Sequence, residues 1–252
     1  MKLRIRVSAF GIRVAAMAVA AALAGRVPQA SAVRPFEPQQ VTFTARDGVA
    51  VLGVLVLPEK QPAPAVVLLP MMSRGLHDWD AVAARFAEAG IAALAIDFRR
   101  NGGPRIAEGG GDGDDFSDLV LDAAAARAYL GARPEIVGSK VGLAGASLGA
   151  NVAALVAGSD ASIPTIALLS PSLDYRGLHL EQALRRFGSR PALLVASSED
   201  PYALRTVREA VTMGDGPREL RVLSGAGHGT IMLSRAPDLI SAVVDWFVRT
   251  LL

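Results

Sequence analysis

The sequence predicts an α/β fold, a three-layer α/β/α sandwich whose mostly parallel sheet begins with antiparallel strands. From residue 65 onward, short runs of Val, Leu, Ile and Ala alternate with segments of helical periodicity. These runs lack polar alternation, which is typical of parallel strands buried on both faces. Residues 41–44 instead alternate apolar and polar side chains, and the turn signal Asp47-Gly48 leads into a second strand. Helices covering parallel strands after an antiparallel start give the sandwich.

The predicted elements follow one another regularly along the chain. We expect strands at residues 41–44, 49–57, 65–69, 91–96, 140–144, 164–169, 191–196 and 219–223. We expect helices at residues 78–89, 116–130, 150–157, 178–187, 201–213 and 237–252. Gly90 is expected to end the first helix, because glycine adopts the left-handed conformation of a C-terminal cap without strain.

The first 32 residues have the pattern of a signal peptide. Lys2, Arg4, Arg6 and Arg13 precede an apolar run at residues 14–24, and Ala30-Ser31-Ala32 is a small-x-small cleavage site. We predict cleavage after Ala32 and export to the periplasm or the medium, with no stable membrane anchor afterwards. An uncleaved N-terminal anchor helix is the alternative. Residues 33–40 are expected to form an extended lead-in to a single domain at residues 41–252.

Composition narrows the classes of function. The chain has 26 basic and 24 acidic residues; removal of the leader leaves 21 basic and 24 acidic residues, a net charge of −3. Basic residues are not interleaved with aromatic ones, so nucleic-acid binding has little support. The absence of cysteine excludes disulfides, thiol nucleophiles and thiolate metal ligands. The Gly/Asp-rich residues 109–115 lack the ligand spacing of a calcium loop, so we expect a flexible surface loop and neither metal nor cofactor.

Residues 145–149, Gly-Ala-Ser-Leu-Gly, form the pattern G-x-S-x-G between a predicted strand and a predicted helix. A serine at such a turn projects its hydroxyl above the edge of the sheet. The backbone N–H groups after it lie at a helix N-terminus, where developing negative charge is stabilised. The pattern therefore predicts Ser147 as a nucleophile.

A serine nucleophile needs a base, and three histidines are present. His228 lies in a Gly-rich loop after the last predicted strand, at the same edge of a parallel sheet as Ser147. We therefore predict His228 as the base. His179 is expected on the surface of a helix, and His77 could line the site without titrating.

The base needs a carboxylate that fixes its tautomer and stabilises its charged form. Asp200 follows the strand at residues 191–196 and is the predicted partner of His228. Asp200 before Pro201 is also the pattern of a helix N-cap with proline at N1. Glu199 and Asp174 are the alternative acids.

The negatively charged oxygen of an acyl-transfer intermediate needs two hydrogen-bond donors. We predict the backbone N–H of Leu148, directly after the nucleophile, as one donor. The other is expected from the turn after the strand at residues 65–69, where Met72 is the first choice and Met71 the alternative. A packing role for these two methionines is the competing interpretation.

With these motifs in place, residues 41–252 resemble an α/β-hydrolase, most closely the compact branch similar to dienelactone hydrolases and serine aminopeptidases. The chain order Ser147, Asp200, His228 is the order of that fold. Pro70 and Met71 stand where the family has His-Gly, and Asp78-Trp79 follows as it does there. Residues 97–102, Asp-Phe-Arg-Arg-Asn-Gly, are similar to the family's Asp-x-Arg-Gly-x-Gly. Only about twenty residues separate the strands at 164–169 and 191–196, so we expect no large lid domain.

The resemblance implies a Ser-Asp-His hydrolase without metal or organic cofactor. We therefore expect an exported serine hydrolase, carboxylesterase-like, that acts on a small-molecule ester or acyl substrate. A peptidase, amidase or acyltransferase with the same three residues is one alternative, and a binding module without turnover is another. The sequence makes no prediction of the oligomeric state.

Overall fold

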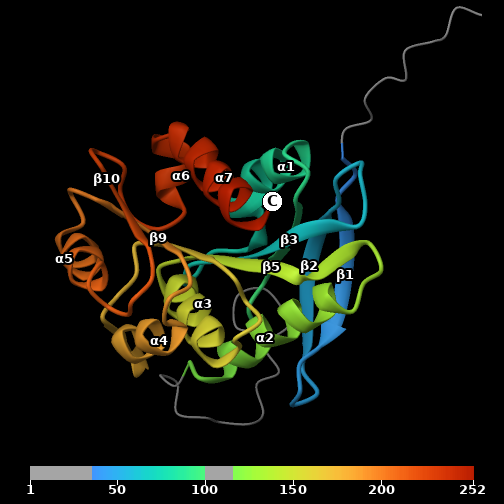
Figure 1. Ribbon diagram of the computed structural model, residues 1–252, viewed down its shortest axis with the longest axis horizontal. Coiled ribbons are helices and arrows are strands. Elements are labelled where there is room, and N and C mark those ends of the chain that lie inside the picture. The colour runs from blue at the N-terminus through green and yellow to red at the C-terminus, as the bar shows by residue number, and fades with distance from the viewer. Residues whose placement is uncertain (1–35, 100–115) are drawn as a thin grey trace, which may run out of the picture. The chain divides into compact units, whose positions relative to one another are not determined.

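The computed structural model describes residues 36–99 and 116–252 (Figure 1). Within this part, residues from Phe36 to Leu252 belong to one compact unit. The predicted signal peptide, its cleavage after Ala32 and the predicted loop at residues 109–115 lie outside the described residues, so these remain predictions.

An eight-stranded sheet has the order β1-β2-β4-β3-β5-β6-β9-β10. The strands are β1 (Gln39–Thr44), β2 (Ala50–Val56), β3 (Ala63–Leu69), β4 (Ala92–Ile96), β5 (Ile136–Ala146), β6 (Ile166–Leu169), β9 (Ala192–Ser197) and β10 (Arg218–Leu223). β2 pairs with β1 and β4 in antiparallel fashion, and the pairs from β4 to β10 are parallel. The predicted mostly parallel sheet with antiparallel N-terminal strands is therefore confirmed.

Helices cover both faces of the sheet, which makes three layers (Figure 1). α2 (Asp118–Gly131), α3 (Leu148–Ser159), α4 (Leu180–Phe187) and α5 (Pro201–Ala210) contribute to one apolar core. α1 (Asp80–Glu88), α6 (Ile231–Arg235) and α7 (Asp238–Leu251) contribute to the other. The sandwich predicted from the alternation of strands and helices is confirmed.

The burial of β3 on both faces explains why its sequence is apolar without alternation. All seven of its residues are buried. Val67 and Leu69 pack in the core under α2 and α3, whereas Val66 and Leu68 pack in the core under α1 and α7. A strand buried on both faces has no side chain in water, so every position favours an apolar residue.

The connection from β6 to β9 differs from the prediction. A hairpin of β7 (Asp174–Tyr175) and β8 (Leu178–His179) precedes α4, so His179 lies on a short strand and not on a helix. The turn between β7 and β8 contains Arg176 with φ of 47° and Gly177 with φ of 88°, conformations that a helix excludes. This segment contains the hairpin and one short helix, so the predicted absence of a large lid is confirmed.

Several element boundaries also differ from those predicted. β1 begins inside the expected lead-in, and β5 begins four residues before the expected strand. The first helix begins only at Asp80, after a 3-10 turn at Leu76–Trp79. The short helix α6 was not predicted, because Gly-rich residues precede it and Pro237 separates it from α7.

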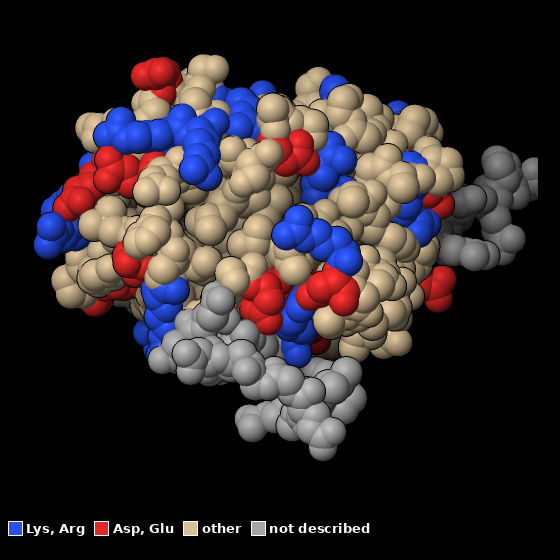
Figure 2. Space-filling model, turned by 90° about the horizontal axis from the view of Figure 1, so that it is seen from below, with Lys and Arg blue, Asp and Glu red and all other residues tan. Residues whose placement is uncertain are grey.

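Charged side chains of both signs lie on the surface of the protein. Figure 2 shows Lys and Arg side chains interspersed with Asp and Glu on the face seen from below. No helix in residues 36–99 and 116–252 is long and apolar enough to cross a membrane.

The buried side chain of Asn151 joins α3 to the segment that leads to β7. Its Nδ2 donates hydrogen bonds to the carbonyl oxygens of Ser172 and Leu178, at 2.8 and 2.9 Å. Its Oδ1 accepts a hydrogen bond from the N–H of Ser172 at 2.9 Å. Because the amide bonds three backbone groups away from water, its removal takes one hydrogen bond from each of them.

We therefore expect Asn151→Ala to lower the free energy of unfolding by about 3 kcal/mol. Urea denaturation measures this change. Ser159→Ala is the control, since Ser159 Oγ bonds to the carbonyl of Leu155 at an exposed position, and we expect a change within about 0.5 kcal/mol. Equal stability of Asn151→Ala and wild type would contradict the role given to this amide.

Candidate active site

The carboxyl edge of the sheet brings together three side chains from three loops. Ser147 follows β5, Asp200 follows β9 and His228 follows β10. His228 Nε2 lies 2.8 Å from Ser147 Oγ, and His228 Nδ1 lies 2.5 Å from Asp200 Oδ2. The three predicted residues therefore form one continuous chain of hydrogen bonds. The imidazole is 41% exposed, whereas the Asp200 side chain is 15% exposed.

The backbone around Ser147 is a tight and strained turn. Ser147 has φ of 51°, a left-handed conformation that is unfavourable for serine. A Cβ at Gly145 would lie 2.1 Å from the carbonyl oxygen of Gly149, and a Cβ at Gly149 would lie 2.5 Å from that of Pro70. Both glycines are therefore required by close backbone contacts, and the strain fixes where the Ser147 hydroxyl lies.

The two carboxylate oxygens of Asp200 have different hydrogen-bond partners. Oδ1 accepts a hydrogen bond from the N–H of Ala203 at 3.1 Å and caps α5, with Pro201 at the first helical position. Oδ2 lies against His228 Nδ1. The two interpretations of Asp200 from sequence, helix cap and partner of histidine, are therefore compatible.

The alternative acids and histidines have other partners. Glu199 Oε2 accepts hydrogen bonds from Ser197 Oγ and the N–H of Gly225, both at 2.6 Å, and Oε1 accepts one from Ser198 Oγ at 2.8 Å. These bonds, that from Ser197 first, lower the pKa of Glu199 from 4.5 to about 2. Glu199 thus fixes the start of the loop that carries His228.

Each of the two remaining histidines lies beside an exposed carboxylate. His179 lies 3.5 Å from Asp174, the other alternative acid. His77 lies 3.1 Å from Asp80. Neither pair belongs to the hydrogen-bonded chain that includes Ser147.

Ser170 is a residue of this edge that the sequence analysis missed. It follows β6, is fully buried and has φ of 50°. Its N–H donates to the carbonyl of Val195 at 2.8 Å, and its Oγ accepts a hydrogen bond from the N–H of Gly229 at 3.0 Å. Since Gly229 directly follows His228, Ser170 holds the loop of the imidazole. The sequence did contain one indication of this role, because Ser170 is a polar residue directly after a buried strand.

A second contact fixes the other side of this loop. Thr230 Oγ1 donates a hydrogen bond to Asp78, which also forms an ion pair with Arg74 at 2.8 Å. Asp78 and Arg74 belong to the segment between β3 and α1. The loop of His228 is therefore joined to the turn in which an oxyanion donor was predicted.

That turn places Met71 and Met72 beside the site. Met71 Sδ lies 2.8 Å from where a Cβ of Gly229 would be. Met72 is 37% exposed, and its Sδ accepts a hydrogen bond from Tyr175 Oη at 3.3 Å. Within the described part of the chain, the N–H groups of Leu148 and Met72 donate to no other residue. Both N–H groups therefore lack an acceptor among the described residues, as a donor to an oxyanion requires.

The described residues include no group of three or more His, Asp or Glu side chains that could hold a metal ion. The carboxyl edge of the sheet instead carries the hydroxyl of Ser147, the imidazole of His228 and the carboxylate of Asp200, joined by hydrogen bonds. This arrangement can move a proton from Ser147 Oγ to His228 while Asp200 balances the charge.

Comparison with known proteins assigns the chain to a family. The model of the dienelactone hydrolase family matches residues 51–246. The chain belongs to this family. The resemblance seen in the sequence is thereby confirmed, and the membership makes the protein a hydrolase with a small-molecule substrate. No curated protein matches the chain.

Solved structures share the fold at low sequence identity. A dienelactone hydrolase from Anabaena variabilis is 21% identical with a TM-score of 0.69, over 85% of this chain and 99% of that chain. An acetyl xylan esterase from Paenibacillus sp. R4 is 21% identical with a TM-score of 0.72, over 88% and 87%. An esterase from Pyrococcus furiosus is 18% identical with a TM-score of 0.66, over 86% and 92%.

The lowered pKa of Glu199 gives a pH dependence of stability. A carboxylate with a depressed folded-state pKa stabilises the fold above its ordinary pKa of 4.5, and this contribution is lost as pH falls towards 2. We expect wild type to be more stable than Glu199→Gln at pH 6, with a difference that shrinks between pH 4.5 and 2. Denaturant unfolding across this range measures it, and a difference independent of pH would contradict the assignment.

Proposed function

We propose that this hydrolase cleaves a carboxylic ester through an acyl-enzyme formed on Ser147. The observation that carries the proposal is the hydrogen-bonded series from Ser147 Oγ through His228 to Asp200. A serine hydroxyl is a weak nucleophile unless a base accepts its proton, and His228 Nε2 lies within hydrogen-bond reach of that proton.

In the first half of the reaction, Ser147 Oγ attacks the ester carbonyl while its proton passes to His228 Nε2. The carbonyl oxygen becomes an oxyanion in a tetrahedral intermediate. The intermediate collapses, the C–O bond to the alcohol breaks, and His228 returns the proton to the leaving alkoxide. Asp200 Oδ2 holds the Nδ1–H tautomer of His228 and stabilises the imidazolium.

Water completes the cycle. His228 removes a proton from the water, whose oxygen attacks the acyl carbon, and the second tetrahedral intermediate releases the carboxylic acid and regenerates Ser147. The oxyanion accepts hydrogen bonds from the N–H of Leu148 and, by our proposal, from that of Met72, with Met71 as the alternative donor. Free N–H groups on Leu148 and Met72 support this pair.

An ester is favoured over an amide as substrate by the comparisons. Of the three similar structures reported above, two are described as esterases and one as a dienelactone hydrolase. The short connection between β6 and β9 contains no lid domain, which supports a site accessible to a small-molecule ester.

Replacing the proposed nucleophile tests the mechanism. We expect Ser147→Ala and His228→Ala to lower kcat/KM for p-nitrophenyl esters by about 10⁴-fold or more, and Asp200→Asn by about 10⁴-fold. Ser147→Ala should also abolish labelling by a fluorophosphonate probe. His179→Ala is the matched control, because His179 pairs with Asp174 outside the hydrogen-bonded chain, and its activity should equal that of wild type.

Undiminished labelling of Ser147→Ala would defeat the proposal. A panel of aminoacyl anilides beside the esters separates an esterase from a peptidase or amidase. Faster turnover of the anilides would replace the ester by an amide as the substrate class.

Ser170 gives a prediction about the base. Ser170→Ala and Ser170→Gly both remove the acceptor of the Gly229 N–H, so both should lower kcat by about 10- to 100-fold through a misplaced His228. Glycine tolerates φ of 50°, whereas alanine keeps the strain. Steady-state kinetics with p-nitrophenyl esters decides the matter: if Ser170→Gly retains wild-type kcat, the backbone turn and not the hydroxyl positions the loop.

A further inference from the structure

The outer edge of β10 has no strand partner among the described residues. β10 is the last strand of the sheet and pairs with β9 on one side (Figure 1). The N–H of Ala192 donates to the carbonyl of Pro217, and that of Ser198 to the carbonyl of Leu223. Backbone groups alternate in direction along a strand, so residues 217, 219, 221 and 223 face β9. The N–H and C=O groups of Arg218, Leu220 and Val222 therefore point outward.

Two apolar side chains accompany this open edge. Leu220 is 37% exposed and Val222 is 45% exposed, and both project from the same face of β10. They are two of the six large hydrophobic side chains that are exposed in the described part of the molecule. An edge strand with outward backbone groups and exposed apolar side chains is a surface on which another strand can pair.

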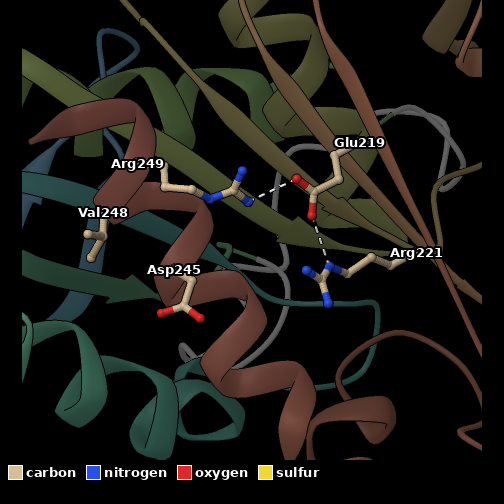
Figure 3. A pocket seen from close by; sticks show the side chains of 5 residues that line it. All are labelled: Glu219, Arg221, Asp245, Val248 and Arg249. Atoms are coloured by element: carbon tan, nitrogen blue, oxygen red, sulfur yellow. Dashed lines mark hydrogen bonds and ion pairs between the residues drawn. The ribbon is translucent and has the colours of Figure 1, made fainter.

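The opposite face of β10 carries a charged depression. It is lined by Glu219, Arg221, Asp245, Val248 and Arg249. Figure 3 shows the Glu219 carboxylate between two guanidinium groups, at 2.8 Å from Arg249 and 3.0 Å from Arg221. Glu219 lies near the start of β10, away from the carboxyl edge that holds His228. This depression is therefore not part of the proposed active site.

The sequence of β10 is complementary to itself in one antiparallel register. If Leu220 of one copy lies opposite Leu220 of a second copy, Arg218 lies opposite Val222. These are the residues whose backbone groups point outward, so each such pair can exchange two hydrogen bonds. In the same register Glu219 lies opposite Arg221 of the second copy, and Arg221 opposite Glu219. Opposite charges in directly facing positions stabilise a strand pair.

Neighbouring registers lack this complementarity. A shift by one residue in either strand would place an outward backbone group opposite an inward one, which breaks the ladder. A shift by two residues keeps the ladder but places Glu219 opposite Glu219, or Arg221 opposite Arg221. Facing like charges are destabilising. The charges on this edge therefore oppose other pairings and favour the register centred on Leu220.

We propose that two copies of this chain associate through β10, in antiparallel pairing centred on Leu220. The contact is isologous, with a two-fold axis passing between the two Leu220 residues. It continues the sheet from one copy into the next and covers Leu220 and Val222 of both. A six-residue strand makes a small interface, so the dimer forms at high protein concentration and dissociates on dilution.

Sedimentation velocity over a series of protein concentrations tests the proposal. We expect the wild-type mass to approach twice that of the monomer at high concentration and to return to the monomer on dilution. Leu220→Lys places two ammonium groups at the axis and should weaken association at least 10-fold. Leu52→Lys is the matched control, because Leu52 is 48% exposed on β2, and should associate as wild type does.

A charge exchange tests whether residues 219 and 221 of the two copies face one another across the contact. Arg221→Glu alone and Glu219→Arg alone each place like charges opposite one another in the homodimer, so each should remain monomeric. An equimolar mixture of the two variants restores opposite charges at every facing position and should form a heterodimer. Thermal unfolding of each variant checks that its monomer is folded, since Glu219→Arg also removes the contact with Arg249.

Three outcomes would overturn the proposal. These are a wild type that is monomeric at all concentrations, a Leu220→Lys dimer as strong as that of wild type, and a mixture of folded charge variants that stays monomeric.

Discussion

The close contact between the end of β5, the end of β3 and the start of α3 is the constraint on which the site depends. The carbonyl oxygens of Leu69 and Pro70 approach Gly149 so closely that no side chain fits there. Gly149 and Gly145 approach each other in the same way. Ser147 is held between them with φ of 51°. A strained backbone persists only where the surrounding structure holds it, and here three elements do so.

The loop of His228 is fixed by groups from three other segments. Glu199 bonds to Gly225 at the start of the loop, and Ser170 bonds to Gly229 just after the histidine. Thr230 bonds to Asp78 beyond it. A Gly-rich loop has high conformational freedom, so these hydrogen bonds supply the order that its own sequence does not. The imidazole can therefore lie between Ser147 and Asp200 before substrate binds.

The fold was predictable because its central strands are buried on both faces. Continuous apolar runs such as that of β3 identify parallel strands, and the order of the loops then places Ser147, Asp200 and His228 at one edge. The hairpin before α4 was missed because its turn depends on Arg176 and Gly177, and positive φ at arginine has no signal in local sequence. Ser170 was missed for a related reason. Its partner Gly229 is 59 residues away, so only the folded chain reveals the contact.

Asp200 joins the formation of a helix to the orientation of the histidine. One carboxylate oxygen caps the N-terminus of α5 and the other orients His228. Two hydrogen bonds therefore hold the side chain of Asp200 in place. Glutamate is one methylene longer and cannot keep both distances without moving the backbone of α5. Transplanting the acid to the end of another strand would leave α5 without its cap. The choice of aspartate at this position is thus set jointly by architecture and chemistry, which limits how far the site can be redesigned one residue at a time.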